Sequence, residues 1–189
     1  MSIWSVIGSR CLPSSWESRV GEVVDLLLSR GHRICSGGAV GADLAVLRSL
    51  VLHGASACQG SSVFLPGDLS LAPPSCVPWL SRFAALGGEI VEGSASARSS
   101  RREVVAVLLI RNCALVRASV GVVAFVSGCS TGSWFTVGQA IRRDLAVIVF
   151  PVDGPKCLHH FVGGSWVPCR SLAGAYVFTY FKKELGGAS

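Results

Sequence analysis

The chain has 189 residues, of which 50% are hydrophobic and 15% are charged, so it can bury a core and is not intrinsically disordered. Its 17 Lys and Arg against 11 Asp and Glu give a net charge of +6, which suits an anionic partner such as nucleic acid or a nucleotide and equally suits solubility alone. No uninterrupted apolar run approaches the ~20 residues of a membrane span, and the amino end carries no signal-peptide pattern. We therefore expect a cytoplasmic protein with no membrane partner.

Strand-like and helix-like segments alternate along the chain up to Pro151. The expected strands cover residues 3–7, 33–35, 61–65, 89–92, 120–126 and 146–150. The expected helices cover residues 15–30, 42–53, 79–86 and 103–117, followed by one that ends at Arg143. The strands are continuous apolar runs, which is typical of a parallel sheet covered by helices on both faces. The fold class predicted from this pattern is α/β with a mostly parallel sheet.

The pattern weakens after Pro151. Gly163, Gly164 and Pro168 are expected to interrupt regular structure, and residues 175–181 can form one last strand. We therefore divide the chain into a main domain over residues 1–153 and a carboxyl-terminal appendage over residues 154–189. The appendage is expected to pack on the main domain or to extend it.

The cysteines give no sign of a metal centre. All eight lie outside any C-x-x-C pair, which favours free thiols in a reducing compartment. The loose group of Cys157, His159, His160 and Cys169 matches no standard zinc module. We expect neither a metal nor a cofactor.

Two glycine-rich turns each follow an expected strand and open into an expected helix. They are SGGAVGAD, residues 36–43, and SGCSTGS, residues 127–133. Such a turn exposes backbone N–H groups beside the positive end of a helix dipole, which suits phosphate. Because parallel strands end at one edge of the sheet, these turns and the Gly8-Ser9-Arg10 segment are expected to line one rim.

Other interpretations of these residues stay open. SGGAVGAD lacks the dinucleotide spacing and SGCSTGS lacks the P-loop lysine, so each turn can equally be a tight strand-to-helix connection. Asp43 falls in the first turn of its helix, where a structural role is favoured over ligand contact. Arg111 and Asn112 interrupt an apolar helix and form either part of a site or a solvent-facing turn.

The order of these motifs resembles a known superfamily. GSR, SGGAVGAD, Arg111-Asn112 and VVAFVSGCSTGSWFTVGQA together are similar to the Rossmann-like superfamily that includes the DNA-processing protein DprA (Smf) and the LOG nucleotide hydrolases, often called SLOG. The likeness spans roughly residues 3–151. It implies a Rossmann-like fold and a pocket for a nucleotide or for the phosphates of a nucleic acid.

The resemblance also implies a set of ligand-binding residues. Carried over position by position, they are Gly8, Ser9, Arg10, Ser36, Gly37, Gly38, Gly41, Asp43, Arg111, Asn112, Gly128, Ser130, Thr131, Gly132, Ser133 and Thr136. Charge would come from Arg10 and Arg111, with Arg142 or Arg143 as further candidates.

The function favoured by this resemblance is binding rather than catalysis. The protein is expected to hold a nucleotide or single-stranded DNA through phosphates, and no catalytic residue is assigned. The alternatives are a LOG-type nucleoside 5'-monophosphate glycosidase and a sensor of a nucleotide-derived signal. The glycosidase is disfavoured because the LOG turn carries a glutamate where this chain has Ser133, Trp134 and Phe135. A homodimer is compatible with the composition, but no surface for it is identified.

Overall fold

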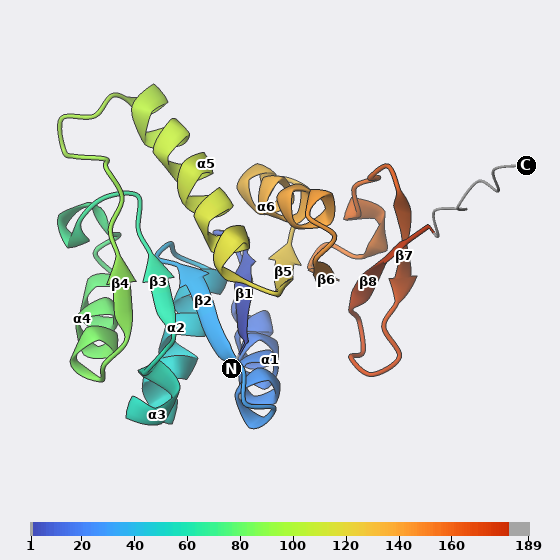
Figure 1. Cartoon of the computed structure of the whole chain (residues 1–189), viewed down its shortest axis with the longest axis horizontal. Helices are drawn as coiled ribbons and strands as arrows, with labels where there is room; N and C mark the ends of the chain where they lie inside the picture. The colour runs from blue at the N-terminus through green and yellow to red at the C-terminus, as the bar shows by residue number, and fades with distance from the viewer. Residues whose placement is uncertain (1, 182–189) are drawn as a thin grey trace, which may run out of the picture.

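The computed structural model describes residues 2–181, which form one eight-stranded sheet with helices on both faces (Figure 1). The strands are β1 (Ile3–Gly8), β2 (Arg33–Gly37), β3 (Ser62–Phe64), β4 (Glu89–Val91), β5 (Gly121–Val126), β6 (Ala146–Pro151), β7 (Gly164–Pro168) and β8 (Tyr176–Tyr180). Their order in the sheet is β4-β3-β2-β1-β5-β6-β8-β7, and all pairs from β4 to β6 are parallel. The predicted α/β, mostly parallel, Rossmann-like fold is confirmed.

The helices divide between the two faces of the sheet. They are α1 (Glu17–Ser29), α2 (Ala42–His53), α3 (Ala55–Cys58), α4 (Val77–Ala85), α5 (Arg101–Ala118) and α6 (Thr131–Arg142), with short 3-10 turns at Ser14–Trp16, Leu69–Leu71 and Pro155–Cys157. One core cluster joins α1, α2 and α4 to the sheet, and the other joins α5 and α6 to its opposite face. Adjacent residues of β1 point into the two cores, Val6 into the first and Ile7 into the second. Burial on both faces is why these strands read as unbroken apolar runs.

Helix α5 begins two residues before its predicted start because of a capping box. The Ser100 side chain accepts a hydrogen bond from the backbone N–H of Glu103 (3.3 Å), and the Glu103 carboxylate accepts one from the N–H of Ser100 (2.6 Å). These contacts satisfy two donors that a helix end otherwise leaves unpaired. The S-x-x-E spacing that signals this start is visible in the sequence.

The order of the strands creates a switch point between β1 and β5. From β1 the chain builds the sheet outwards through β2, β3 and β4, whereas β5 and β6 lie on the other side of β1. The loops that leave β1 and β5 therefore diverge at the carboxyl edge of the sheet. Open α/β sheets bind their ligands in the crevice that this divergence leaves.

The prediction that regular structure is interrupted between Pro151 and residue 175 is wrong. Strand β7 forms there and pairs with β8, which in turn pairs antiparallel with β6. Gly164 is the first residue of β7. A Cβ at this position would lie 2.4 Å from the carbonyl oxygen of Thr179, so only glycine allows the strand to pair here. Pro168 ends the same strand at the edge of the sheet, where a missing N–H is tolerated.

The sheet thus continues beyond residue 153 through β8 and β7. The Tyr180 hydroxyl strengthens this connection by donating a hydrogen bond to the Leu145 carbonyl (2.8 Å). The boundary proposed at residue 153 stays a prediction, and residues 182–189 of the appendage lie outside the described residues. Within the described part of the chain, no helix combines the length and the apolar character needed to cross a membrane.

Phe150 is expected to be a main contributor to the stability of the fold. It is fully buried at the end of β6 and stacks on Phe125 with ring centroids 4.7 Å apart. Phe150→Ala should lower the free energy of unfolding by about 3–5 kcal/mol, because it leaves a cavity in the core. Urea denaturation measures the change. Leu52→Ala, at a position that is 78% exposed, is the control and should change stability by less than about 0.5 kcal/mol.

Candidate functional site

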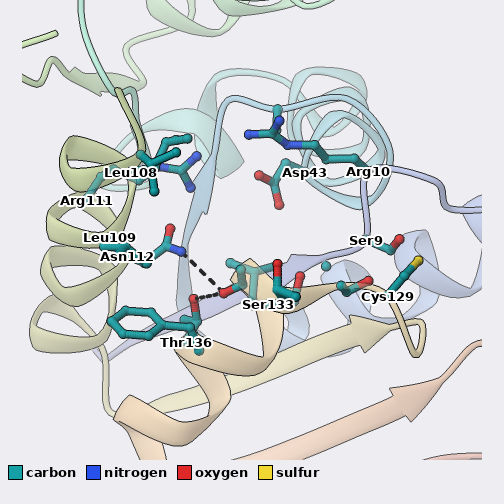
Figure 2. A pocket seen from close by; sticks show the side chains of 18 of the residues that line it. Ser9, Arg10, Asp43, Leu108, Leu109, Arg111, Asn112, Cys129, Ser133 and Thr136 are labelled. Carbon is teal, nitrogen blue, oxygen red and sulfur yellow. Dashed lines mark hydrogen bonds between the residues drawn. The ribbon is translucent and has the colours of Figure 1, made fainter. Parts of the chain in front are cut away.

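A cavity of about 760 Å³ opens at the carboxyl ends of β1 and β5, between α5 and α6 (Figure 2). Residues 7–11 line it from β1 and the loop that follows, and residues 129–133 line it from the start of α6 together with Phe135 and Thr136. The inner face of α5 forms a third wall, and Ala39 and Asp43 contribute from the turn before α2 and its first residues. The cavity lies at the switch point between β1 and β5, and its size is that of a small-molecule site.

The turn before α6 is held in shape by serine side chains. The Ser130 hydroxyl accepts a hydrogen bond from the N–H of Ser127 (3.1 Å), and the two hydroxyls lie 2.7 Å apart. The Ser9 hydroxyl lies 3.1 Å from that of Ser127, so the loops after β1 and β5 are joined. These contacts fix the entry into α6.

The first turn of α6 presents free donors to the cavity. Among the hydrogen bonds of the described residues, the backbone N–H groups of Gly132 and Ser133 have no acceptor. The Gly132 carbonyl, in contrast, accepts from Thr136 Oγ1 (2.9 Å) and from Asn112 Nδ2 (3.4 Å), as Figure 2 shows. Free amides at the positive end of a helix form an anion-binding arrangement.

The other glycine-rich turn surrounds a carboxylate of the protein itself. Asp43, in the first turn of α2, is 5% exposed. Burial raises the pKa of its carboxyl group, opposed by the Arg111 guanidinium, then by the backbone amides of Ala39 and Gly8, and then by Arg10. The amides near this turn therefore already face a negative charge. This differs from the free amides at the start of α6.

The buried side chain of Asp43 and the partly buried side chain of Arg111 lie close together with opposite charges. Burial lowers the pKa of Arg111, whereas the Asp43 carboxylate raises it. Figure 2 shows the side chains of Arg10 and Arg111 both directed toward Asp43. Two buried atoms of the pair, Asp43 Oδ1 and Arg111 Nε, have no hydrogen-bond partner among the described residues.

Gly37 allows this pair to form. A Cβ at position 37 would lie 2.2 Å from Arg111 Nη1 and 2.3 Å from Asp43 Oδ2. Both charged groups therefore rest against the bare α-carbon of the glycine. The phosphate-binding role of Gly37 stays a prediction, and the structure adds a packing role.

Several other predicted site residues lie outside the larger cavity. Ser36 is buried and donates its hydroxyl hydrogen to the Val6 carbonyl (2.7 Å). Gly38 lines a separate cavity of about 250 Å³ beside Leu65. Gly41 has φ +81°, and its backbone passes against the carbonyl of Ser9. These residues shape the turn.

Gly128 is also engaged within the protein, because its N–H donates to Asp153 Oδ2 (2.9 Å). The cavity does bring together most of the predicted set. Its predicted lining residues are Gly8, Ser9, Arg10, Asp43, Arg111, Asn112, Ser130, Thr131, Gly132, Ser133 and Thr136.

Sequence analysis missed the apolar wall and one arginine of the cavity. Arg101, Val105, Leu108 and Leu109 line it from α5 and precede Asn112 at helical spacing. That spacing, traced back from Asn112, is a signal that could have identified them. Arg142 and Arg143, the further candidates for positive charge, lie at the carboxyl end of α6, away from the cavity.

The structure adds no metal site. Within residues 2–181, no group of three or more His, Cys, Asp or Glu side chains is placed to hold a metal ion.

Among the thiols, burial raises the pKa of Cys35 to about 11, which keeps it protonated and unreactive.

Comparison with known protein families and structures shows the family of this chain. Residues 1–161 match the family described as DNA recombination-mediator protein A. The chain belongs to this family. The predicted resemblance to DprA is thereby confirmed, and no curated protein matches the sequence significantly.

Solved structures share the fold at low sequence identity. DNA processing protein A from Helicobacter pylori, described as binding single-stranded DNA, has a TM-score of 0.63 and 18% identity over 79% of this chain and 65% of that one. DprA from Streptococcus pneumoniae has a TM-score of 0.59 and 18% identity, covering 80% of this chain and 50% of that one. A structural-genomics target designated TM1055 has a TM-score of 0.52 and 16% identity, covering 78% and 72%. The chain therefore spans only about half to two thirds of the two DprA proteins.

Gly37→Ala tests the packing of the charge pair. The added methyl group should displace Asp43 and Arg111 and lower the free energy of unfolding by about 1–3 kcal/mol. Gly21→Ala is the matched control, since a Cβ there meets nothing within 4 Å inside α1, and it should instead stabilise by about 0.5–1 kcal/mol. Denaturant unfolding of both variants measures the difference. Equal effects of the two substitutions would contradict the packing role.

Proposed function

We propose that the protein binds single-stranded DNA by holding backbone phosphates at the amino end of α6. The observation that carries this proposal is the pair of free backbone amides at Gly132 and Ser133, which stand where the cavity opens at the switch point of the sheet. Membership of the DNA recombination-mediator protein A family and the single-stranded DNA named for its Helicobacter pylori relative support the choice of ligand.

The charge around the cavity supports the same choice. Arg10 and Arg101 line it and are exposed, and Arg98 and Arg102 are exposed beside Arg101. Among the described lining residues, Asp43 is the only acid, and it is buried. A phosphate near the α6 amides would therefore meet positive charge and hydroxyl donors. A free nucleotide offers the same phosphate and is the competing ligand.

Removal of the Arg10 charge should weaken binding, because the arginine would no longer hold a phosphate. Arg10→Ala should reduce affinity for a short oligothymidylate by about ten- to a hundredfold, the effect of one charge-assisted hydrogen bond. The slope of log affinity against log salt concentration should become shallower by about 0.7 for each phosphate that the variant no longer neutralises. Fluorescence anisotropy over a salt series measures both quantities.

Arg142→Ala is the control for this experiment. It removes the same charge from the far end of α6 and should leave the affinity and the salt slope close to those of the unaltered protein. Equal losses in the two variants would mean that net charge, rather than the cavity, drives binding. Affinity for oligothymidylate that is flat in salt would favour the free nucleotide.

The described lining residues of the cavity lack the pair of carboxyl groups that the glycosidase alternative requires. Most glycoside hydrolysis uses two carboxyl groups, one as acid and one as base or nucleophile. Asp43 is the single acid among the described lining residues. Incubation with nucleoside 5'-monophosphates should therefore release no free base above a protein-free control, as measured by liquid chromatography. Release that disappears in Asp43→Asn would establish the hydrolase instead.

A further inference from the structure

The two glycine-rich turns at the cavity differ in the charge that they present to a ligand. The amides at the start of α6 have no acceptor among the described residues, whereas the turn before α2 surrounds the Asp43 carboxylate. Figure 2 shows Asp43 on one side of the cavity and Ser133 and Cys129 across from it. A negative group is therefore attracted to one side of the cavity and repelled from the other.

Asp43 itself has an unused acceptor. It is 5% exposed and lines the cavity, whereas its Oδ1 atom is itself buried and has no hydrogen-bond partner among the described residues. A buried carboxylate oxygen without a donor is unfavourable, because burial removes it from water without replacing the hydrogen bonds. A ligand that brings an N–H or O–H group to the Asp43 carboxylate would relieve part of that penalty.

A phosphate cannot fill this role, because at neutral pH it is an anion without a strong donor. The nucleoside part of a nucleotide can, because each DNA base carries an N–H donor and a ribose carries a free 2'-hydroxyl. The wall beside this position is apolar, formed by Val105, Leu108 and Leu109 of α5. Such a surface suits the faces of a base or the carbon skeleton of a sugar.

We propose that Asp43 is a nucleoside-binding residue, whose carboxylate accepts a hydrogen bond from a neutral N–H or O–H donor of a nucleotide whose phosphate lies at the amino end of α6. This inference rests on the proposed function and deepens it. It predicts a single orientation of the nucleotide in the cavity, with the phosphate at α6 and the nucleoside at α2. Arg111 is the main counter-charge of Asp43, and Arg10, which contributes less to that role, is exposed and is the arginine that we expect to reach a phosphate.

The first experiment changes only the ligand and uses the unaltered protein. Oligothymidylate is compared with the same strand methylated at N3 of every thymine, which removes the N–H donor of the base and keeps every phosphate. Oligouridylate is compared with oligodeoxyuridylate, which tests the 2'-hydroxyl. One of these pairs should differ in affinity by about ten- to a hundredfold, the effect of a hydrogen bond to a charged group. The pair that differs identifies the donor as base or sugar.

The second experiment asks whether Asp43 is the acceptor. In Asp43→Asn, the preference found in the first experiment should shrink to a few-fold at most, because the charge that strengthens the hydrogen bond is gone. Asp25→Asn removes the same charge from the exposed surface of α1 and should keep the full preference. Thermal unfolding shows whether each variant is folded, and the ligand comparison stands even if Asp43→Asn does not fold.

The outcomes distinguish this inference from the function on which it rests. If neither pair of strands differs in affinity, or if Asp43→Asn keeps the full preference, the nucleoside-binding role of Asp43 is overturned. A preference kept in Asp43→Asn would mean that the N3 methyl group acts by its bulk alone. If no strand shows salt-dependent binding and Arg10→Ala has no effect, the proposed function fails, and this inference fails with it.

Discussion

The buried carboxylate of Asp43 and the partly buried guanidinium of Arg111 lie against the bare α-carbon of Gly37, and the charge at the centre of the cavity depends on this pair. An isolated buried charge is strongly unfavourable, so each group requires the other nearby. The pair joins α2, from one face of the sheet, to α5, from the opposite face. It does so at the carboxyl edge, where the loops from β1 and β5 diverge. Removal of either partner would leave an uncompensated charge at the centre of the site.

The pair also explains why one small chain carries two glycine-rich turns with different properties. The turn before α2 approaches the loop after β1 so closely that Gly41 must take a positive φ beside the Ser9 carbonyl. Its nearby amides face Asp43. The turn before α6 is instead organised by hydroxyl contacts between Ser127 and Ser130, and leaves the amides of Gly132 and Ser133 free. Similar sequences thus give one turn beside a carboxylate of the protein and one whose free amides have no acid beside them among the described lining residues.

The β7–β8 extension contacts α6, the helix that lines the cavity. Trp134, in the first turns of α6, stacks on His159 with ring centroids 4.2 Å apart and forms an edge contact with Trp166 of β7. Its indole N–H donates to the Ser127 carbonyl (3.2 Å) in the turn before α6. The residues after β6 therefore support the helix that presents the free amides, so the extension contributes to the geometry of the cavity from outside it.

The sequence by itself determined the parallel sheet and the edge at which the glycine-rich loops gather, because apolar runs and helical periodicity depend on local composition. It also identified Arg10, Asp43, Arg111, Asn112 and the SGCSTGS turn as one group, through a resemblance in motif order that the family match confirms. It missed β7, because Gly164 and Pro168 act as breakers in isolation and are accepted at an edge strand only when β8 is present. It also assigned Gly37 and Gly128 to phosphate, which stays a prediction, and only the structure shows that they lie against Arg111 and Asp153. Which amides are free depends on contacts between residues far apart in the chain, and only the tertiary structure brings those residues together.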